Sequence, residues 1–185
     1  KKNKKDQPIE ISKALLLFDL IHKFNNKNIL KIINLQLHSH INIHGMHKSI
    51  NPCAQAEYIN NLYEMKNMFL FFGIKPSKEI EFQIINMSSV LKNLFHKDNT
   101  IALFNGSNNA NYESLIKINS LNKDIKSKKL HDINNGLAIY EFNKLKIFFD
   151  VTQPTSKLLS QNLHSGTLSF ELSYDNEKII TNCGS

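Results

Sequence analysis

The sequence predicts an α+β fold, in which a helical N-terminal part is followed by an antiparallel β-sheet. Up to about residue 96, apolar side chains recur every three or four positions, the spacing of an amphipathic helix. From about residue 136 they alternate with polar side chains, and Asn143-Lys144 and Asp175-Asn176 separate the runs as tight turns do. Helices first and strands second indicate two separate layers. Because so few strands do not close a sandwich, we expect an incomplete β-sandwich.

Two helices are expected in the first forty residues. Residues 11–24 carry one apolar stripe, and residues 28–37 form a second, shorter candidate helix. Short linkers between such segments predict antiparallel neighbours. The members of the stripe, which we expect to face the core, are Ile11, Ala14, Leu15, Phe18 and Ile21.

Two longer helices follow, and both have clear start signals. Asn51 is a good cap and Pro52 suits the first helical position, so the third helix begins there and stops at Gly73. Pro76-Ser77 opens a fourth helix that reaches about His96. Its apolar residues keep helical spacing: Ile80, Ile84, Met87, Leu91 and Leu94.

The middle of the chain changes character. Residues 100–104 read as a strand that ends at the turn pair Asn105-Gly106, and residues 110–118 as a weak helix. Residues 119–135 are polar and lysine-rich, as expected of a connecting loop. We therefore divide the chain into a helical domain (1–96), a connecting segment (97–135) and the first strands of a β-domain (136–185).

Four strands are expected in the last part, over residues 136–142, 145–151, 167–174 and 177–182. In the third of these, the apolar Leu168, Phe170 and Leu172 point to one side, and Thr167, Ser169 and Glu171 point to the other. This alternation predicts an antiparallel sheet with one covered face.

Composition limits the function classes. The net charge is +7 and the chain contains no arginine, so bidentate readout of bases or phosphates by guanidinium is excluded. The lysines are dispersed, and we do not expect nucleic-acid binding. The longest apolar runs are far shorter than a membrane span requires. Cys53 and Cys183 do not form a disulfide framework.

Four of the eight histidines lie within residues 38–47: His38, His40, His44 and His47. A metal site is one interpretation, because His38 and His40 would share one side of an extended segment. Against it, no acidic residue occurs between Asp19 and Glu57, and the spacing matches no common zinc motif. We therefore predict no metal here, with the metal site kept as the minority interpretation.

Four segments together resemble a known family. They are "GMHKSINP" (45–52), "HKDNTIALFNG" (96–106), "IFFDV" (147–151) and "HSGTLSFELS…IITNCGS" (164–185). Their order and spacing are similar to those of the heparinase II/III-like proteins, closest to a bacterial branch with a Gly-Gly-His-Ile-Ser-Arg-Asn-Pro motif. The resemblance implies the end of an α/α-toroid followed by the start of a β-sandwich, in a fragment of a longer protein.

The resemblance also implies a set of site residues. His47 falls on the motif histidine, and Ser49 and Asn51 match the same motif, so His47 is expected to be catalytic and to bind or neutralise a uronate, with Ser49 and Asn51 as substrate contacts. Because His47 precedes a helix start, free N–H groups there would favour an anion. In the β-domain, His164 is the second expected catalytic residue and Asn162 a further substrate contact.

The chain departs from the family pattern at several positions. Ile50 replaces an arginine of the closest branch, and Ala54 and Gln55 stand where the better-characterised lyases have Tyr and His. In the sheet, Asn162 replaces a histidine and Gly166 an aspartate. The chain also carries Tyr58 and Tyr63 on the following helix. Either could substitute for the missing tyrosine, although partly buried helix tyrosines more often only pack.

The resemblance implies a polysaccharide lyase that cleaves uronic-acid-containing glycans such as heparin by β-elimination. The expected partner is an acidic polysaccharide, and the expected location is the periplasm or cell envelope. Relatives can hold a divalent metal in the β-domain, but the residues of this chain imply no cofactor. Because motif residues are replaced, a non-catalytic glycan-binding or cell-envelope protein on the same scaffold is the alternative.

Overall fold

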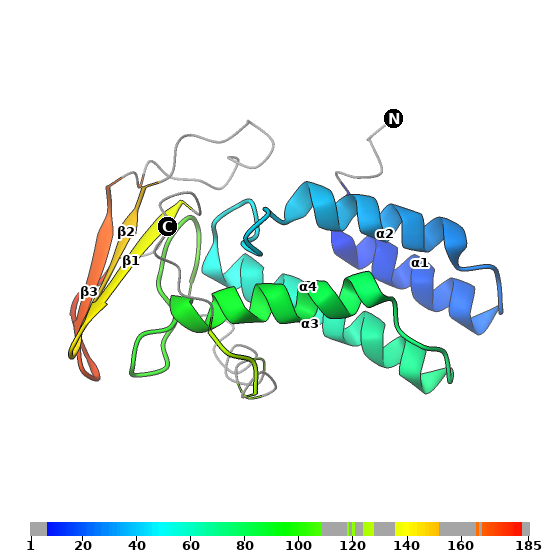
Figure 1. Ribbon diagram of the computed structural model, residues 1–185. Coiled ribbons are helices and arrows are strands. Elements are labelled where there is room, and N and C mark those ends of the chain that lie inside the picture. The colour runs from blue at the N-terminus through cyan, green and yellow to red at the C-terminus, as the bar shows by residue number, and fades with distance from the viewer. Residues whose placement is uncertain are drawn as a thin grey trace.

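The computed structural model describes residues 7–108, 118, 120, 124–127, 136–151, 166 and 168–182. Within these residues a helical part precedes a sheet, which confirms the α+β class (Figure 1). The helices are α1 (Ile9–Ile21), α2 (Lys27–His40), α3 (Pro52–Phe71) and α4 (Lys78–Leu91), and the 3₁₀ turn η2 (Lys92–Leu94) continues α4. The strands are β1 (Leu137–Phe142), β2 (Leu145–Asp150), β3 (Phe170–Tyr174) and β4 (Glu177–Ile180).

The helices pack side by side, and the sheet stands at one end of them. Helix α1 contacts α2 and α3, and α3 contacts α4, as the short linkers predict. Helices α2 and α4 end, and α3 begins, on the side that faces the sheet (Figure 1). The connection from α2 to α3 and the segment after α4 therefore both lie near the junction of the two layers.

Helix α3 has the boundaries that its capping residues predict. The Asn51 side chain accepts a hydrogen bond from the Ala54 N–H at 2.9 Å, and Pro52 occupies the first helical position. At the other end, Gly73 adopts φ +67°, the left-handed conformation that ends many helices. These signals act within a few residues, so the sequence alone identifies them.

The buried face of α1 differs from the expected one. The buried residues are Ile9, Ser12, Leu16 and Leu20. The predicted stripe instead points outward, and Ile11, Leu15, Phe18 and Ile21 are 44–55% exposed. Because apolar residues surround most of this helix, periodicity identifies a helix but not the face that α2 and α3 cover.

The sheet has the strand order β1-β2-β3-β4, and every neighbouring pair is antiparallel. Its two predicted turns are present, with Asn143 at φ +56° and Asp175 at φ +54°. Asparagine and aspartate tolerate this conformation, which explains why these pairs predict the hairpins.

The face of the sheet that meets the helices is partly polar. Glu171 and Ser173 on β3 are fully buried, as are Phe148 and Asp150 on β2, and Lys146 on β2 is 7% exposed. Phe170 is instead 39% exposed and Leu168 is 74% exposed. The alternation was predicted correctly, and on β3 the covered side is the polar one. The reason lies in His96, which supplies a polar partner for this face.

The expectation of a strand over residues 100–104 is wrong. Only Ile101 forms a bridge, with Phe95, and the segment otherwise runs as irregular chain whose apolar side chains join the core. Most of the expected helix at 110–118 and of the expected loop at 119–135 lies outside the described residues.

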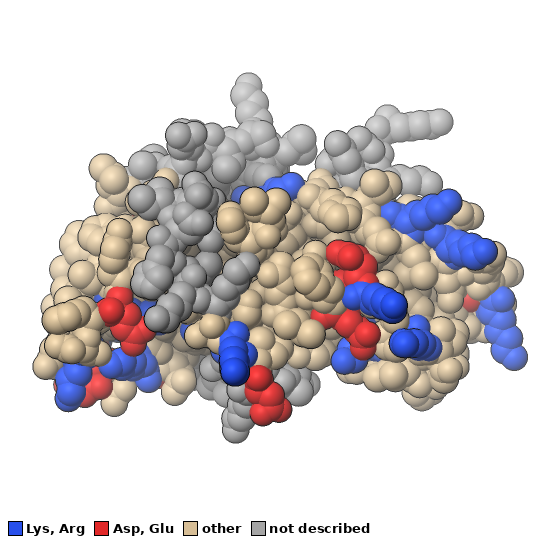
Figure 2. All heavy atoms as spheres, in the orientation of Figure 1, with Lys and Arg blue, Asp and Glu red and all other residues tan. Residues whose placement is uncertain are grey.

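Lysines and acidic residues intermingle on the face drawn in Figure 2, without a continuous basic stripe. The lysines, which are dispersed along the sequence, are thus also dispersed on this face of the molecule. Among the described residues, none of the helices combines the length and apolar character needed to cross a membrane.

Candidate functional site

A tight loop between α2 and α3 brings two of the four clustered histidines together. The Lys48 N–H donates to the His40 carbonyl at 2.8 Å, and the Asn42 N–H donates to the Met46 carbonyl at 2.9 Å. The chain thereby folds back on itself, and the ring centroids of His40 and His47 lie 6.2 Å apart.

The other two histidines do not join them. Helix α2 extends to His40, so His38 and His40 lie in its last turn and not on an extended segment as expected. Residues two apart on a helix point in different directions, which removes the geometric basis of the metal interpretation. Among the described residues, no group of three or more His, Cys, Asp or Glu side chains could hold a metal ion.

Gln55 fixes the loop against the helices. Its Oε1 accepts from the His47 N–H at 2.6 Å, and its Nε2 donates to the carbonyls of Gly45 and Met87, each at 2.9 Å. Gly45 adopts φ +92°, and a β-carbon there would lie 2.8 Å from the side chain of Asn86 on α4. The Gln55 amide thus orients the backbone of His47.

The His47 ring is held in one uncharged form. The Ser49 N–H donates to Nδ1 at 3.2 Å, and the Ser49 Oγ, which accepts from the Asn51 N–H, lies 2.7 Å from the same nitrogen. Nδ1 therefore accepts, and the ring proton resides on Nε2. Burial, then His40 and Lys48, lower the pKa of His47 to about 4. At neutral pH His47 offers a hydrogen-bond donor and no positive charge.

Tyr58 completes a wall of three rings. Its hydroxyl lies 3.3 Å from Nδ1 of His40, and its ring centroid lies 5.3 Å from that of His47. Burial, and secondarily Glu10, raise the pKa of Tyr58 well above its usual range. The side chain is 5% exposed, so the phenol keeps its proton at neutral pH.

These rings line a pocket of about 280 Å³. Residues from the start of α1 and from the first two turns of α3 form the rest of its wall. The lining residues are Gln7, Pro8, Ile9, Glu10, His40, His47, Ala54, Glu57 and Tyr58. Two imidazoles, a phenol and two carboxylates around one cavity can bind a polyhydroxylated ligand and move protons.

The start of α3 is closed to an anion, contrary to expectation. The Cys53 N–H donates to Ser107 Oγ at 3.4 Å, the Ala54 N–H to Asn51 Oδ1 at 2.9 Å, and the Gln55 N–H to the Asn51 carbonyl at 3.0 Å. Pro52 has no N–H. Every N–H group of the first turn is therefore satisfied within the protein.

Asn51 holds this region together. Its Nδ2 donates to the Asn105 carbonyl at 2.8 Å, and the Asn105 Nδ2 donates to the Ile50 carbonyl at 3.1 Å. Ser107 Oγ donates to Asn51 Oδ1 at 2.9 Å. Asn51 is thus engaged in structural hydrogen bonds, and its role as a substrate contact stays a prediction. Ile50 adopts φ +54°, a strained conformation for a β-branched residue.

The other predicted site residues are distributed as follows. Ser49 contacts His47 directly, and both are half-buried beside the pocket. His164 and Asn162 lie outside the described residues, so their predicted roles remain predictions. Tyr63 is on α3 but does not line the pocket.

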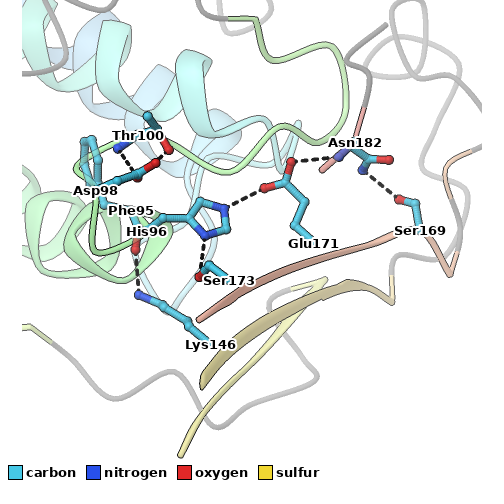
Figure 3. Close-up of polar contacts among 9 residues, drawn as sticks. All are labelled: Phe95, His96, Asp98, Thr100, Lys146, Ser169, Glu171, Ser173 and Asn182. Carbon is cyan, nitrogen blue, oxygen red and sulfur yellow. Dashed lines mark hydrogen bonds and ion pairs between the residues drawn. The ribbon is translucent and has the colours of Figure 1, made fainter. Parts of the chain in front are cut away.

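A second polar cluster, which the sequence analysis did not identify, lies where the helical part meets the sheet. His96 Nε2 donates to Glu171 Oε2 at 2.8 Å, and Nδ1 lies 2.9 Å from Ser173 Oγ (Figure 3). The side chains of His96 and Glu171 are at most 1% exposed. Glu171 also accepts from the Asn182 N–H at 3.0 Å. Because His96, Glu171 and Ser173 are buried between the helical part and the sheet, we assign these contacts a structural role.

Lys146 extends this junction. Its Nζ donates to the Phe95 carbonyl at 2.7 Å and lies 5.1 Å from the centroid of the Phe148 ring. Burial lowers the pKa of Lys146. The sequence signal for the cluster was the alternation of Glu171 and Ser173 with apolar residues, together with His96 at the end of a helix.

Comparison with known proteins identifies relatives of this fold. Residues 126–185 match the family described as heparinase II/III-like, C-terminal. The structure is similar to a heparan sulfate lyase, HepC, from Pedobacter heparinus, with a TM-score of 0.68 and 12% identity over 94% of this chain. It is also similar to a heparinase III, the BT4657 gene product, with a TM-score of 0.65 and 16% identity over 94% of this chain.

These matches confirm the resemblance read from the motifs and, at such low identity, establish a shared fold. The chain spans 32% of the length of the first structure and 31% of the second. A search of curated protein sequences finds no significant match.

Proposed function

From the match of residues 126–185 to the heparinase II/III-like, C-terminal family, and from the fold shared with a heparan sulfate lyase and a heparinase III, we propose a polysaccharide lyase-like function. The protein would cleave uronic-acid-containing glycans by β-elimination. Its partner would be an acidic polysaccharide, met in the periplasm or cell envelope.

The pocket between α1, α2 and α3 is the observation that carries this proposal. It places the motif histidine, His47, beside a second imidazole and a phenol. Beta-elimination needs hydrogen bonds to the carboxylate, a base for the adjacent proton and an acid for the leaving oxygen. A cavity lined by imidazole and phenol groups meets part of this requirement.

His47 takes the binding role in this scheme. Its Nε2–H can donate to a carboxylate oxygen of the uronate, and Ser49 fixes the ring that presents it. Because the pKa of His47 is lowered to about 4, the contact is a hydrogen bond from a neutral ring. His164 is proposed as the base on the sheet side, with Asn162 as a further contact, as the motif implies.

A non-catalytic glycan-binding protein is the second candidate. It is favoured by Ala54, which lines the pocket at a position where the family resemblance implies a tyrosine. A site that lacks its acid would still bind the glycan through His47.

The test is to incubate the full-length protein with a panel of uronate-containing glycans and follow the ultraviolet absorbance of the unsaturated product. We expect product, and we expect His47→Gln to reduce kcat/KM by about a hundredfold, as the loss of one such donor does. The matched control is His38→Gln, because His38 is exposed and outside the pocket.

The two candidates give different outcomes. Binding to a glycan array without product would replace the lyase by the glycan-binding protein. Neither binding nor product across the panel would contradict both.

A further inference from the structure

The chain reverses direction at Ile50, between the pocket histidine and helix α3. The Ile50 N–H donates to the His47 carbonyl at 2.8 Å, and the Asn51 N–H donates to Ser49 Oγ at 3.3 Å. The same Ser49 Oγ lies 2.7 Å from His47 Nδ1. The conformation of Ile50 therefore determines whether Ser49 lies against the His47 ring.

Ile50 does not favour this conformation by itself. Its φ is +54°, and a β-branched side chain is poorly tolerated there because the β-carbon crowds the adjacent backbone. Asparagine tolerates this region, and this chain places it there at Asn99, Asn105 and Asn143. A backbone outlier of this kind persists where surrounding contacts hold it, and such outliers are concentrated at functional sites.

The contacts that hold Ile50 come from the segment after α4. Asn105 Nδ2 donates to the Ile50 carbonyl at 3.1 Å, and Asn51 Nδ2 donates to the Asn105 carbonyl at 2.8 Å. This reciprocal pair fixes the peptide group between Ile50 and Asn51. Asn105 is 55 residues away from Ile50 in the sequence, and neither of them lines the pocket. The route from Asn105 to the site is therefore the turn at Ile50.

The turn in its present form determines which nitrogen of His47 carries the proton. The Ser49 N–H donates to Nδ1 at 3.2 Å, so Nδ1 accepts and the proton resides on Nε2. In a neutral histidine, the hydrogen bond made by one ring nitrogen sets the tautomer for the other. If the turn relaxed and moved Ser49 away, Nδ1 would lose this donor and Nε2 would no longer be fixed as the donor.

We propose that Asn105 is a positioning residue that holds Ile50 in the left-handed conformation and thereby keeps the His47 ring proton on Nε2. A residue outside the pocket lining thus determines whether His47 presents a hydrogen-bond donor to the cavity. The consequence for glycan turnover rests on the proposed lyase-like function. The state of the His47 ring does not, because it is measured without substrate.

The experiment is nitrogen NMR of the full-length protein with isotope-labelled histidine. The His47 signals are those that disappear in His47→Asn. Asn105→Gly deletes the side-chain donor but keeps a backbone that accepts positive φ. We expect the single Nε2–H form of His47 to give way to a mixture of tautomers. We also expect the pKa of His47 to rise from about 4 toward 6.5, because a freed Nδ1 can take a proton.

Two further variants separate this route from general destabilisation. Asn143→Gly is the matched control, because Asn143 has φ +56° in the exposed turn between β1 and β2. It should leave the His47 signals unchanged. Asn105→Gly/Ile50→Asn is the rescue variant, since asparagine enters the left-handed region without the contact from residue 105. It should restore the wild-type His47 signals.

Wild-type His47 signals in Asn105→Gly, or the same displacement in Asn143→Gly, would overturn the proposal. A rescue variant without the wild-type His47 signals, whether folded or not, would also overturn it. If Asn105→Gly alone does not fold, recovery of the fold and of these signals in the rescue variant supports the same route.

Turnover is measured on the same variants. We expect kcat/KM on a uronate-containing glycan to fall about 10- to 100-fold in Asn105→Gly, as small misplacements of a binding group do, and to recover in the rescue variant. Wild-type turnover in Asn105→Gly would overturn the assignment of Asn105 as a positioning residue for the reaction. A wild-type protein without turnover would contradict the proposed function alone, and the NMR spectra would still decide the role of Asn105.

Discussion

Two histidines of this chain each have a serine hydroxyl beside Nδ1, but they differ in burial and in the partner of their second ring nitrogen. His47 Nδ1 lies 2.7 Å from Ser49 Oγ, and His96 Nδ1 lies 2.9 Å from Ser173 Oγ. The second nitrogen of His96 meets Glu171, whereas that of His47 has no hydrogen-bond partner among the described residues. His96 is sealed between the layers, and His47 is half-buried beside a pocket. A histidine that lines a cavity can contact a ligand when one of its ring nitrogens has no partner in the protein.

The comparison also shows what each region contributes. The His96 cluster joins elements that are 75 residues or more apart in the sequence, from the end of η2 to β3. The His47 region is local, since its hydrogen bonds to Ser49 and Gln55 span at most eight residues. We expect the first region to matter most for stability and the second for binding.

The largest effect is expected when the buried pair is broken. Glu171→Ala leaves His96 and the Asn182 N–H without their acceptor inside the protein, and should lower the free energy of unfolding by about 3–5 kcal/mol. Chemical denaturation measures it. Asp175→Asn is the control, because its pair with Lys144 is solvent-exposed, and little change is expected. A cost no greater than that of the control would show that the cluster does not hold the layers together.

A smaller effect follows from the pH dependence of stability. The unfolded imidazole of His47 binds a proton near pH 6.5, and the folded one near pH 4. Between these two pH values the unfolded state binds more protons than the folded state. The contribution of the uncharged His47 ring to the free energy of unfolding is therefore complete above pH 6.5 and is lost as the pH falls through 4. For this half-buried ring we expect the free energy of unfolding to fall by about 2–3 kcal/mol over this pH range.

The measurement is denaturant unfolding at a series of pH values, for the wild type and His47→Asn. The difference between the two should depend on pH within this window. A parallel pH dependence in both proteins would contradict the lowered pKa of His47.

The smallest effect concerns the loop that positions His47. Gly45→Ala combines a left-handed φ of +92° with a β-carbon 2.8 Å from Asn86, whereas Gly73→Ala has the left-handed φ of +67° and nothing within 4 Å. We expect the free energy of unfolding to fall by about 2 kcal/mol in Gly45→Ala and by about 1 kcal/mol in Gly73→Ala, and thermal unfolding measures both. The difference isolates the contact with α4. Gly45→Ala/Asn86→Ala should recover it, and equal losses at the two glycines would show that the contact costs nothing.

Several elements were readable from the sequence because their signals are local. Asn51, Pro52 and Gly73 set the limits of α3, and Asn143 and Asp175 set two hairpins. The motif around His47 indicated the region of the pocket. Each of these depends on a residue's own backbone preference or on partners within a few positions.

The errors share a physical reason. Ile11 and Phe18 on α1 point outward, and Glu171 on β3 points inward, because burial depends on which element lies opposite. Residues 100–104 have strand-like composition but only a single bridge, at Ile101. A segment cannot encode the identity of its neighbour.

The sequence by itself determined the class of the fold, the helix caps, the turns and the family resemblance, since local backbone chemistry and motif order carry them. Only the tertiary structure decided that His40 and His47, and not His38, meet Tyr58 in one pocket. It also placed His96 on the polar face of the sheet. These are contacts between separate elements of the fold, and hydrophobic periodicity indicates that a face is buried but not what covers it.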